Sequence, residues 1–228
     1  MVKVKICGVT TPEDALLAAE WGADYLGLNF YPGSPRFVDV ARAREIAAAL
    51  RDVRGARGPA GLVGVFVNRP VAEVEEIAAA VGLDLVQWSG DEGPETVAPF
   101  AARAIKVFRT GGHPGEAALA PYAGVWGVMF DAPHGTLYGG TGASWPYESI
   151  AAVAAAAGGA GVAAGAARRR VFLAGGLGPD NVARAIAAGR PFAVDVCSRV
   201  ESAPGKKDPE LLRRLFEEVR HGEEQAPS

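Results

Sequence analysis

The sequence has 228 residues, of which 49% are hydrophobic and 21% are charged, a composition that can bury one core of ordinary domain size. The formal net charge of −3 excludes a broad electrostatic attraction to nucleic acid or to anionic lipid. We therefore expect a single domain with a small-molecule ligand, and no nucleic-acid or membrane partner.

Cysteine usage and the start of the chain indicate a reduced compartment. There are two cysteines, Cys7 and Cys197, and the opening MVKVKICG lacks the apolar segment of a secretory signal. The uncharged stretch Ile150–Ala167 consists mainly of alanine and glycine, which is too weakly hydrophobic for a membrane span. These features predict a cytoplasmic protein.

Strand-like runs alternate with helical patterns along the whole chain, which is typical of βα units around a parallel sheet. The predicted strands are Val2–Ile6, Ala23–Leu28, Gly61–Val67, Leu83–Gln87, Ala104–Phe108, Val125–Phe130, Arg170–Ala174 and Phe192–Val196. The predicted helices are Pro12–Trp21, Val40–Leu50, Val71–Val81, Tyr147–Ala157, Asp180–Ala188 and Pro209–Arg220. Eight such units predict a (β/α)₈ barrel, because a doubly wound open sheet usually has about five to seven strands.

Local patterns place the helix starts and the connecting loops. Thr11 precedes Pro12 as an N-cap, and Gly178-Pro179-Asp180-Asn181 resembles a second helix start. The loops Asp52–Ala60 and Gly158–Arg170 precede strands and so belong to the face away from the site. Residues 221–228 are predicted to form a flexible tail.

Active sites of such barrels lie at the carboxyl ends of the strands, where this sequence is polar or glycine-rich. These ends carry Cys7-Gly8, Asn29, Asp131, Gly175-Gly176 and Cys197-Ser198-Arg199. Each of these residues has a plain structural alternative. A cysteine at a strand end is often a small buried apolar residue, an aspartate is often a loop cap or an ion-pair partner, and a glycine pair is often a simple turn.

Strand alternation sharpens the expected site. If Val4 and Ile6 face the helices, then Lys5 and Cys7 point into the barrel. The same alternation places Asp195 and Cys197 inside, next to the first strand. We therefore expect Lys5 to pair with Asp195, and Cys7 to lie close to Cys197 near the mouth of the barrel.

Glycine-rich sequence after the seventh strand predicts an anion site. Backbone N–H groups at Gly175 and Gly176, followed by a helix start, attract phosphate. The three histidines show no metal-ligand spacing, and dinucleotide, P-loop and nucleophile-elbow motifs do not occur. The chemistry is therefore expected to need neither a cofactor nor a metal.

The opening VKVKICGVTTPEDA resembles the start of phosphoribosylanthranilate isomerases. Further segments follow in the order of that family, among them GADYLGLNFYPGSPRFV, VGVFVN, LAGGLGPDNV and FAVDVCSRVE. The resemblance implies a cofactor-free Amadori rearrangement of N-(5′-phosphoribosyl)anthranilate in tryptophan biosynthesis. It implies a phosphorylated sugar–anthranilate substrate. Barrels of this kind are found as monomers and as dimers, so we expect a monomer or a homodimer. By the same resemblance, Cys7 is the general base and Asp131 is the general acid.

The resemblance also implies the substrate contacts. Arg36 matches the position that binds the anthranilate carboxylate, and Gly175, Gly176 and Ser198 match the phosphate site. Asp195 is included among the substrate-binding residues. Arg199 stands where glycine is usual in the family, so it either changes the geometry of the last loop or adds a phosphate contact, and it is included on the second ground. Gln87-Trp88-Ser89-Gly90 and Ala143-Ser144-Trp145-Pro146 also depart from the family pattern.

Two other functions compete with this interpretation. One is a related phosphosugar barrel, such as ProFAR isomerase or indole-3-glycerol phosphate synthase. ProFAR isomerase has an aspartate at the end of its first strand, where this chain has Cys7. The other is a phosphate-binding barrel without turnover, which would be free to lose Cys7 and Asp131. Both residues are present, and this favours an enzyme.

Overall fold

The computed structural model describes residues 1–51, 60–110, 114–132 and 169–225. Within these ranges the chain forms a closed barrel of parallel strands in the order β1 to β8. The strands are β1 (Lys3–Cys7), β2 (Tyr25–Asn29), β3 (Gly61–Phe66), β4 (Leu85–Trp88), β5 (Ala104–Arg109), β6 (Gly127–Asp131), β7 (Val171–Ala174) and β8 (Ala193–Val196). The predicted (β/α)₈ barrel is therefore confirmed, and each strand end lies within two residues of its predicted position.

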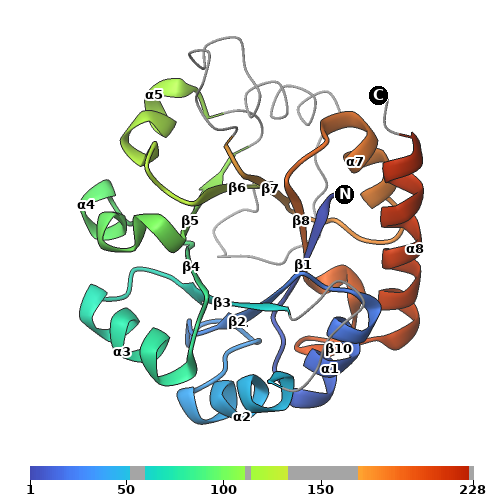
Figure 1. The fold of residues 1–228 in the computed structure, drawn as a ribbon, viewed down its shortest axis with the longest axis horizontal. Helices are drawn as coiled ribbons and strands as arrows, with labels where there is room; N and C mark the ends of the chain where they lie inside the picture. Colours follow the sequence, from blue (N-terminus) through green and yellow to red (C-terminus); the bar gives the residue numbers. More distant parts are fainter. Residues whose placement is uncertain (52–59, 111–113, 133–168, 226–228) are drawn as a thin grey trace.

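Helices surround this ring of strands (Figure 1). They are α1 (Pro12–Trp21), α2 (Val40–Leu50), α3 (Val71–Val81), α4 (Pro94–Val97), α5 (Glu116–Leu119), α7 (Val182–Gly189) and α8 (Pro209–Gln225). The predicted bounds of α1, α2 and α3 match at both ends. The start of α1 is fixed by the Thr11 side chain, which accepts a hydrogen bond of 3.2 Å from the Asp14 backbone N–H. The predicted helix Tyr147–Ala157 and the loop 143–146 lie outside the described residues.

The buried apolar residues form two cores, one inside the barrel and one between the strands and the helices. The inner core contains Val63, Leu85, Ile105, Val107, Met129, Phe172, Ala174 and Ala193. The outer core packs the other faces of the strands against the helices and includes Val4 and Ile6, both fully buried. This confirms the predicted alternation of β1, in which Lys5 faces the barrel interior.

The segment before α7 differs from its prediction. We expected a helix from Asp180, but α7 begins at Val182. The Asn181 side chain explains the delay, because its Oδ1 accepts a hydrogen bond from the Gly178 N–H at 2.8 Å and its Nδ2 donates to the Gly176 carbonyl at 2.9 Å. An asparagine side chain that bonds nearby backbone in this way competes with the helix.

The end of the chain also differs from its prediction. We expected a flexible tail over 221–228, but α8 continues to Gln225, and residues 226–228 lie outside the described residues. The extra turn is packed, because Gly222 is buried against α7. A Cβ on Gly222 would lie 2.7 Å from the Ala183 Cα. Glycine at this position therefore lets the two helices approach closely.

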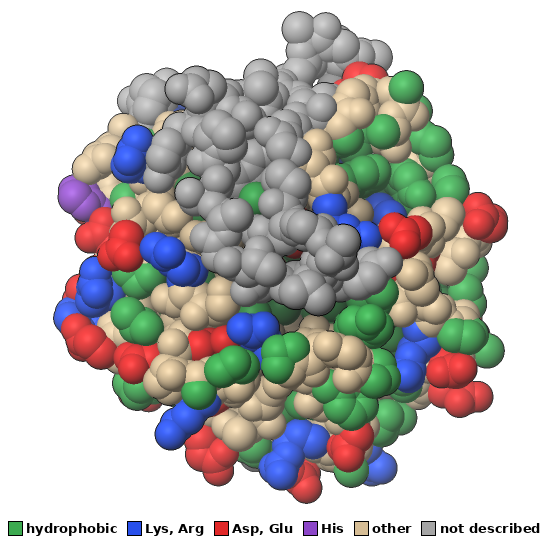
Figure 2. Space-filling view, turned by 180° about the vertical axis from the view of Figure 1, so that it is seen from behind, with side chains coloured by type: hydrophobic (Ala, Val, Ile, Leu, Met, Phe, Trp, Pro, Cys, Tyr) green, Lys and Arg blue, Asp and Glu red, His purple; other side chains and the backbone are tan. Residues whose placement is uncertain are grey.

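The distribution of charged side chains on the surface agrees with the small net charge of −3. In the space-filling view, Lys and Arg side chains are interspersed with Asp and Glu side chains over the described part of this face (Figure 2). Among the helices of the described ranges, none has both the length and the apolar character that a membrane span requires.

Candidate active site

A cavity of about 520 Å³ opens at the carboxyl ends of the strands, the edge at which barrel enzymes place their sites. Its volume suits a small organic ligand. The cavity wall brings together most of the predicted site residues: Cys7, Arg36, Asp131, Gly175, Gly176, Asp195 and Ser198. Arg199 is not part of this wall.

A buried ion pair lies beneath the catalytic candidates. Lys5 and Asp195 are partners across β1 and β8, and the Lys5 Nζ lies 2.7 Å from Asp195 Oδ1. Burial alone would lower the pKa of Lys5, but the Asp195 carboxylate and Cys7 raise it above its ordinary value. Lys5 is therefore a fixed cation below Cys7. The predicted pairing of Lys5 with Asp195 is confirmed.

Cys7 is a buried thiol whose surroundings favour the thiolate form. A hydrogen bond from Cys197 lowers its pKa, burial raises it, and the Lys5 charge lowers it again, so that the pKa of Cys7 is about 6. The same contact raises the pKa of Cys197. Both cysteines are free thiols. The predicted closeness of Cys7 and Cys197 is confirmed, and the thiolate of the pair resides on Cys7.

Glycines next to Cys7 make the close packing of this corner possible. Gly8 has a φ of 69°, a conformation that glycine adopts without strain. A Cβ on Gly27 would lie 2.8 Å from Cys7 Sγ and 3.0 Å from Lys5 Nζ. Any larger residue at Gly27 would therefore displace the thiol or the cation.

The pKa of Asp131 is shifted in the opposite direction to that of Cys7. Asp131 ends β6 beside Arg109, its partner in β5, and is partly buried in the cavity wall. Burial raises the pKa of Asp131 to about 7, the negative charges of Asp195 and Cys7 add to this effect, and Arg109 and Lys5 oppose it. Near neutral pH, a large fraction of this carboxyl group is protonated and able to donate its proton.

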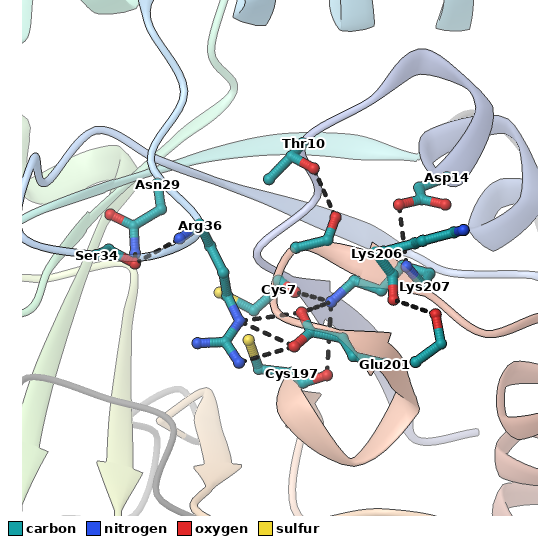
Figure 3. A network of polar contacts seen from close by, with 12 residues as sticks. Cys7, Thr10, Asp14, Asn29, Ser34, Arg36, Cys197, Glu201, Lys206 and Lys207 are labelled. Atoms are coloured by element: carbon teal, nitrogen blue, oxygen red, sulfur yellow. Dashed lines mark hydrogen bonds and ion pairs between the residues drawn. The ribbon is translucent and has the colours of Figure 1, made fainter.

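Arg36 belongs to a charged network that the sequence reasoning did not predict (Figure 3). Its Nη2 lies 2.7 Å from Glu201 Oε2 and its Nε lies 3.0 Å from Glu201 Oε1, a two-point contact that fixes the guanidinium plane. Lys207 Nζ donates to Glu201 at 2.8 Å and to the Cys7 carbonyl at 2.6 Å. The network thus joins the Arg36 side chain to the backbone of Cys7.

A short hairpin brings Glu201 and Lys207 to this position. β9 (Glu201–Ala203) pairs with β10 (Lys206–Lys207) in antiparallel orientation, and Gly205 makes the turn with a φ of 81°. In the sequence, the Pro204-Gly205 pair shortly after the last barrel strand is typical of a turn.

The predicted phosphate loop lies in the wall, with one correction. Gly175 and Gly176 have φ values of 97° and 62°, and a Cβ on Gly175 would lie 2.4 Å from the Ala132 Cβ. Ser198 starts a single 3₁₀ turn, Ser198–Val200. The Arg199 guanidinium instead binds Asp180 at 3.2 Å on the outside, because the backbone turn directs its side chain toward the segment before α7.

Metal-ligating side chains do not gather in the described part of the chain. No group of three or more His, Cys, Asp and Glu residues there could hold a metal ion. His221 lies exposed on α8 beside Gln225, and His113 and His134 lie outside the described residues. The cavity therefore offers acid–base side chains and hydrogen-bonding groups.

Comparisons with known proteins agree with one another. Residues 4–218 match the family model described as N-(5′-phosphoribosyl)anthranilate isomerase. Curated relatives of that name include one from Citrifermentans bemidjiense, 44% identical over 96% of this chain and 98% of the relative. Another is from Rubrobacter xylanophilus, 42% identical over 94% of this chain and 97% of the relative.

Solved structures give the same result. Phosphoribosylanthranilate isomerase from Thermotoga maritima superposes with a TM-score of 0.81 and 33% identity, over 96% of this chain and 99% of that one. The enzyme from Thermus thermophilus gives 0.79 and 36%, over 96% and 98%. A further structure, with a TM-score of 0.78 and 33% identity over 96% and 99%, is a complex with reduced 1-(o-carboxyphenylamino)-1-deoxyribulose 5-phosphate.

Proposed function

The chain belongs to the N-(5′-phosphoribosyl)anthranilate isomerase family, and from this premise we propose that Cys7 is the general base of the rearrangement and Asp131 its general acid. The chain is an aldose–ketose isomerase of tryptophan biosynthesis. Its substrate is N-(5′-phosphoribosyl)anthranilate and its product is 1-(2-carboxyphenylamino)-1-deoxyribulose 5-phosphate. The observation that carries the assignment is that Cys7 and Asp131 line one cavity with pKa values shifted in opposite directions.

Asp131 and Cys7 each make one proton transfer, and a tautomerisation to the ketone follows. Asp131 donates its proton to the ring oxygen of the sugar, the bond from that oxygen to C1′ breaks, and a Schiff base forms. The Cys7 thiolate then removes the proton from C2′, and the electron pair moves to give the enolamine. Loss of the proton from the C2′ hydroxyl and protonation at C1′ yield the ketone.

The protonation states suit these roles. Near neutral pH a free aspartic acid is ionised and a free thiol is protonated. Each role therefore requires that the protein environment shift the pKa of the group. Burial keeps part of Asp131 in the acid form, and Cys197 together with Lys5 keeps Cys7 in the thiolate form. Since both steps are proton transfers, the proposal needs no cofactor.

The remaining wall residues hold the ends of the substrate. Arg36 binds the anthranilate carboxylate, since Glu201 uses its Nε and Nη2 and Nη1 makes no hydrogen bond to any residue that the structure describes. Backbone N–H groups at Gly175 and Gly176, with Ser198, bind the phosphate. Asp195 borders the cavity and contacts a hydroxyl group of the sugar. Arg199 is omitted from this proposal because Asp180 binds it outside the cavity.

The cellular setting and the assembly extend the proposal. We place the enzyme in the cytoplasm as one domain that works as a monomer or a homodimer. The Thermotoga maritima protein has been described in a structure of "mutually generated monomers of dimeric" isomerase, which has 32% identity and a TM-score of 0.75 with this chain. That description supports the homodimer as one of the two proposed assembly states.

Turnover by the purified chain tests the function. Loss of the fluorescence of phosphoribosylanthranilate is expected when the protein is added. The product is identified by its NMR spectrum, because substrate and product are isomers of equal mass. ProFAR, the substrate of the rival barrel enzyme, serves as the comparison and is expected to remain unconverted. Conversion of ProFAR in place of phosphoribosylanthranilate would favour the rival, and conversion of neither would favour a binding protein.

A further inference from the structure

Gln87 occupies a fixed position in the wall of the catalytic cavity. It belongs to β4, where Val65 of β3 and Ile105 of β5 are its neighbours across the sheet. Its side chain points inward, as that of Leu85 does in the inner core, and it lines the cavity among the apolar residues Val107 and Met129. A strand bonded on both sides leaves this residue little freedom to move.

Half of the Gln87 amide has a partner and half does not. Its Nε2 donates to Ser89 Oγ at 3.0 Å. Its Oε1 is buried and has no hydrogen-bond partner among the described residues, although Gln87 as a whole is only 4% exposed. Buried side-chain polar atoms are nearly always paired in folded proteins. An unpaired acceptor on a side chain that lines the catalytic cavity is therefore a candidate partner for a group that arrives with the ligand.

The chemistry of the unpaired atom selects the part of the substrate that it can contact. A carbonyl oxygen accepts hydrogen bonds, and it therefore repels the carboxylate and the phosphate, which also only accept. The donors that remain on the substrate are the sugar hydroxyl groups and the amine N–H. We infer that Gln87 is a positioning residue whose Oε1 accepts a hydrogen bond from such an O–H or N–H donor at the reacting centre of the substrate.

The strand order is consistent with this assignment, which rests on the proposed function. In the closed barrel, β4 lies across from β8, so Gln87 faces the phosphate loops from the opposite wall. Arg36 follows β2, Cys7 ends β1 and Asp131 ends β6. A ligand held at both ends by Arg36 and the phosphate loops places its sugar between Cys7, Asp131 and Gln87.

A positioning role and a structural role predict different results for Gln87→Met, which keeps the length of the side chain and removes its polar atoms. If Gln87 were structural, the variant would lose thermal stability. If Gln87 holds substrate, the variant keeps its melting temperature or raises it, since no unpaired acceptor remains. The substrate donor would then lack its partner, and affinity would fall.

The test compares the full-length protein with two variants. Gln87→Met is expected to weaken binding of reduced 1-(o-carboxyphenylamino)-1-deoxyribulose 5-phosphate, called the reduced product below, about tenfold or more. It is also expected to raise KM. The pH dependence of kcat/KM should not change, because the amide does not titrate. Gln225→Met makes the same substitution at an exposed position on α8 and should match wild type. Equal affinity and KM in Gln87→Met and wild type would overturn the inference, as would a parallel loss of melting temperature and activity.

A second ligand identifies the donor and separates this inference from the proposed function. With a reduced product methylated at the amine nitrogen, the penalty for Gln87→Met disappears if the N–H is the donor and persists if a hydroxyl is. Both results support the inference. If wild type neither binds the reduced product nor turns over phosphoribosylanthranilate, the proposed function fails and the inference fails with it. If wild type does both and Gln87→Met is unaffected, the inference alone fails.

Discussion

Cys7→Ser and Asp131→Asn are each expected to lower kcat by at least about 10²-fold, the lower end of what general acid–base groups contribute. A serine hydroxyl at position 7 stays protonated where the thiol ionises, so the C2′ proton has no acceptor. An asparagine amide has no acidic proton for the ring oxygen. Steady-state rates with phosphoribosylanthranilate measure both effects.

Matched controls separate the loss of chemistry from the loss of folding. Asp180→Asn makes the same change as Asp131→Asn outside the cavity, where Asp180 binds Arg199 and Arg214 at the surface. It should leave kcat near that of wild type, because exposed ion pairs contribute little. All variants should also unfold cooperatively. A kcat close to wild type in folded Cys7→Ser or Asp131→Asn would contradict the assigned role of that residue.

The Asp195→Asn variant is expected to lose about 3–5 kcal/mol of unfolding free energy, the cost of removing one partner of a buried ion pair. Lys5 is 0% exposed, so its charge would remain in the barrel without the Asp195 carboxylate at 2.7 Å. Urea unfolding measures the loss. Adding Lys5→Met to Asp195→Asn should recover much of it, because the unpaired charge is then gone.

The pH dependence of this variant gives an independent check. In wild type, the pKa of Lys5 is raised, so the stability contributed by its charge is fully present below the unfolded-state value of about 10.4. This stability is lost as the pH rises from that value through the folded-state pKa. Without Asp195, burial should depress the pKa of Lys5 below its unfolded value, so that the unfolded chain binds more protons and stability increases with pH. A variant as stable as wild type at every pH would rule out this account of Lys5.

Periodicity predicted much of the barrel and of its interior. The alternation in β1 and β8 was sufficient to place Lys5 against Asp195 and Cys7 beside Cys197, because strand side chains alternate strictly between two faces. The N-cap at Thr11 was equally readable, since its partner is three residues away. The roles of Cys7 and Asp131 came from the family resemblance.

Contacts that depend on how the chain folds back on itself, or on which of several partners a side chain binds, were not predicted. Glu201 and Lys207 reach Arg36 and Cys7 only because a hairpin folds back over the barrel mouth, and neither residue has a periodic pattern. Arg199 was placed in the phosphate site, but Asp180 binds it outside. The unpaired oxygen of Gln87 became visible only from the hydrogen bonds of the folded chain.

The pH dependence of kcat/KM in wild type tests the acid–base account most directly, because it reports the ionisation of the free enzyme. The account predicts a bell-shaped profile that rises through about 6 as Cys7 loses its proton and falls through about 7 as Asp131 loses its own. The residual activity of Asp131→Asn should lack the falling limb. A profile that is flat between about pH 5 and 9, or that rises only near the ordinary thiol pKa of about 8.5, would contradict the account.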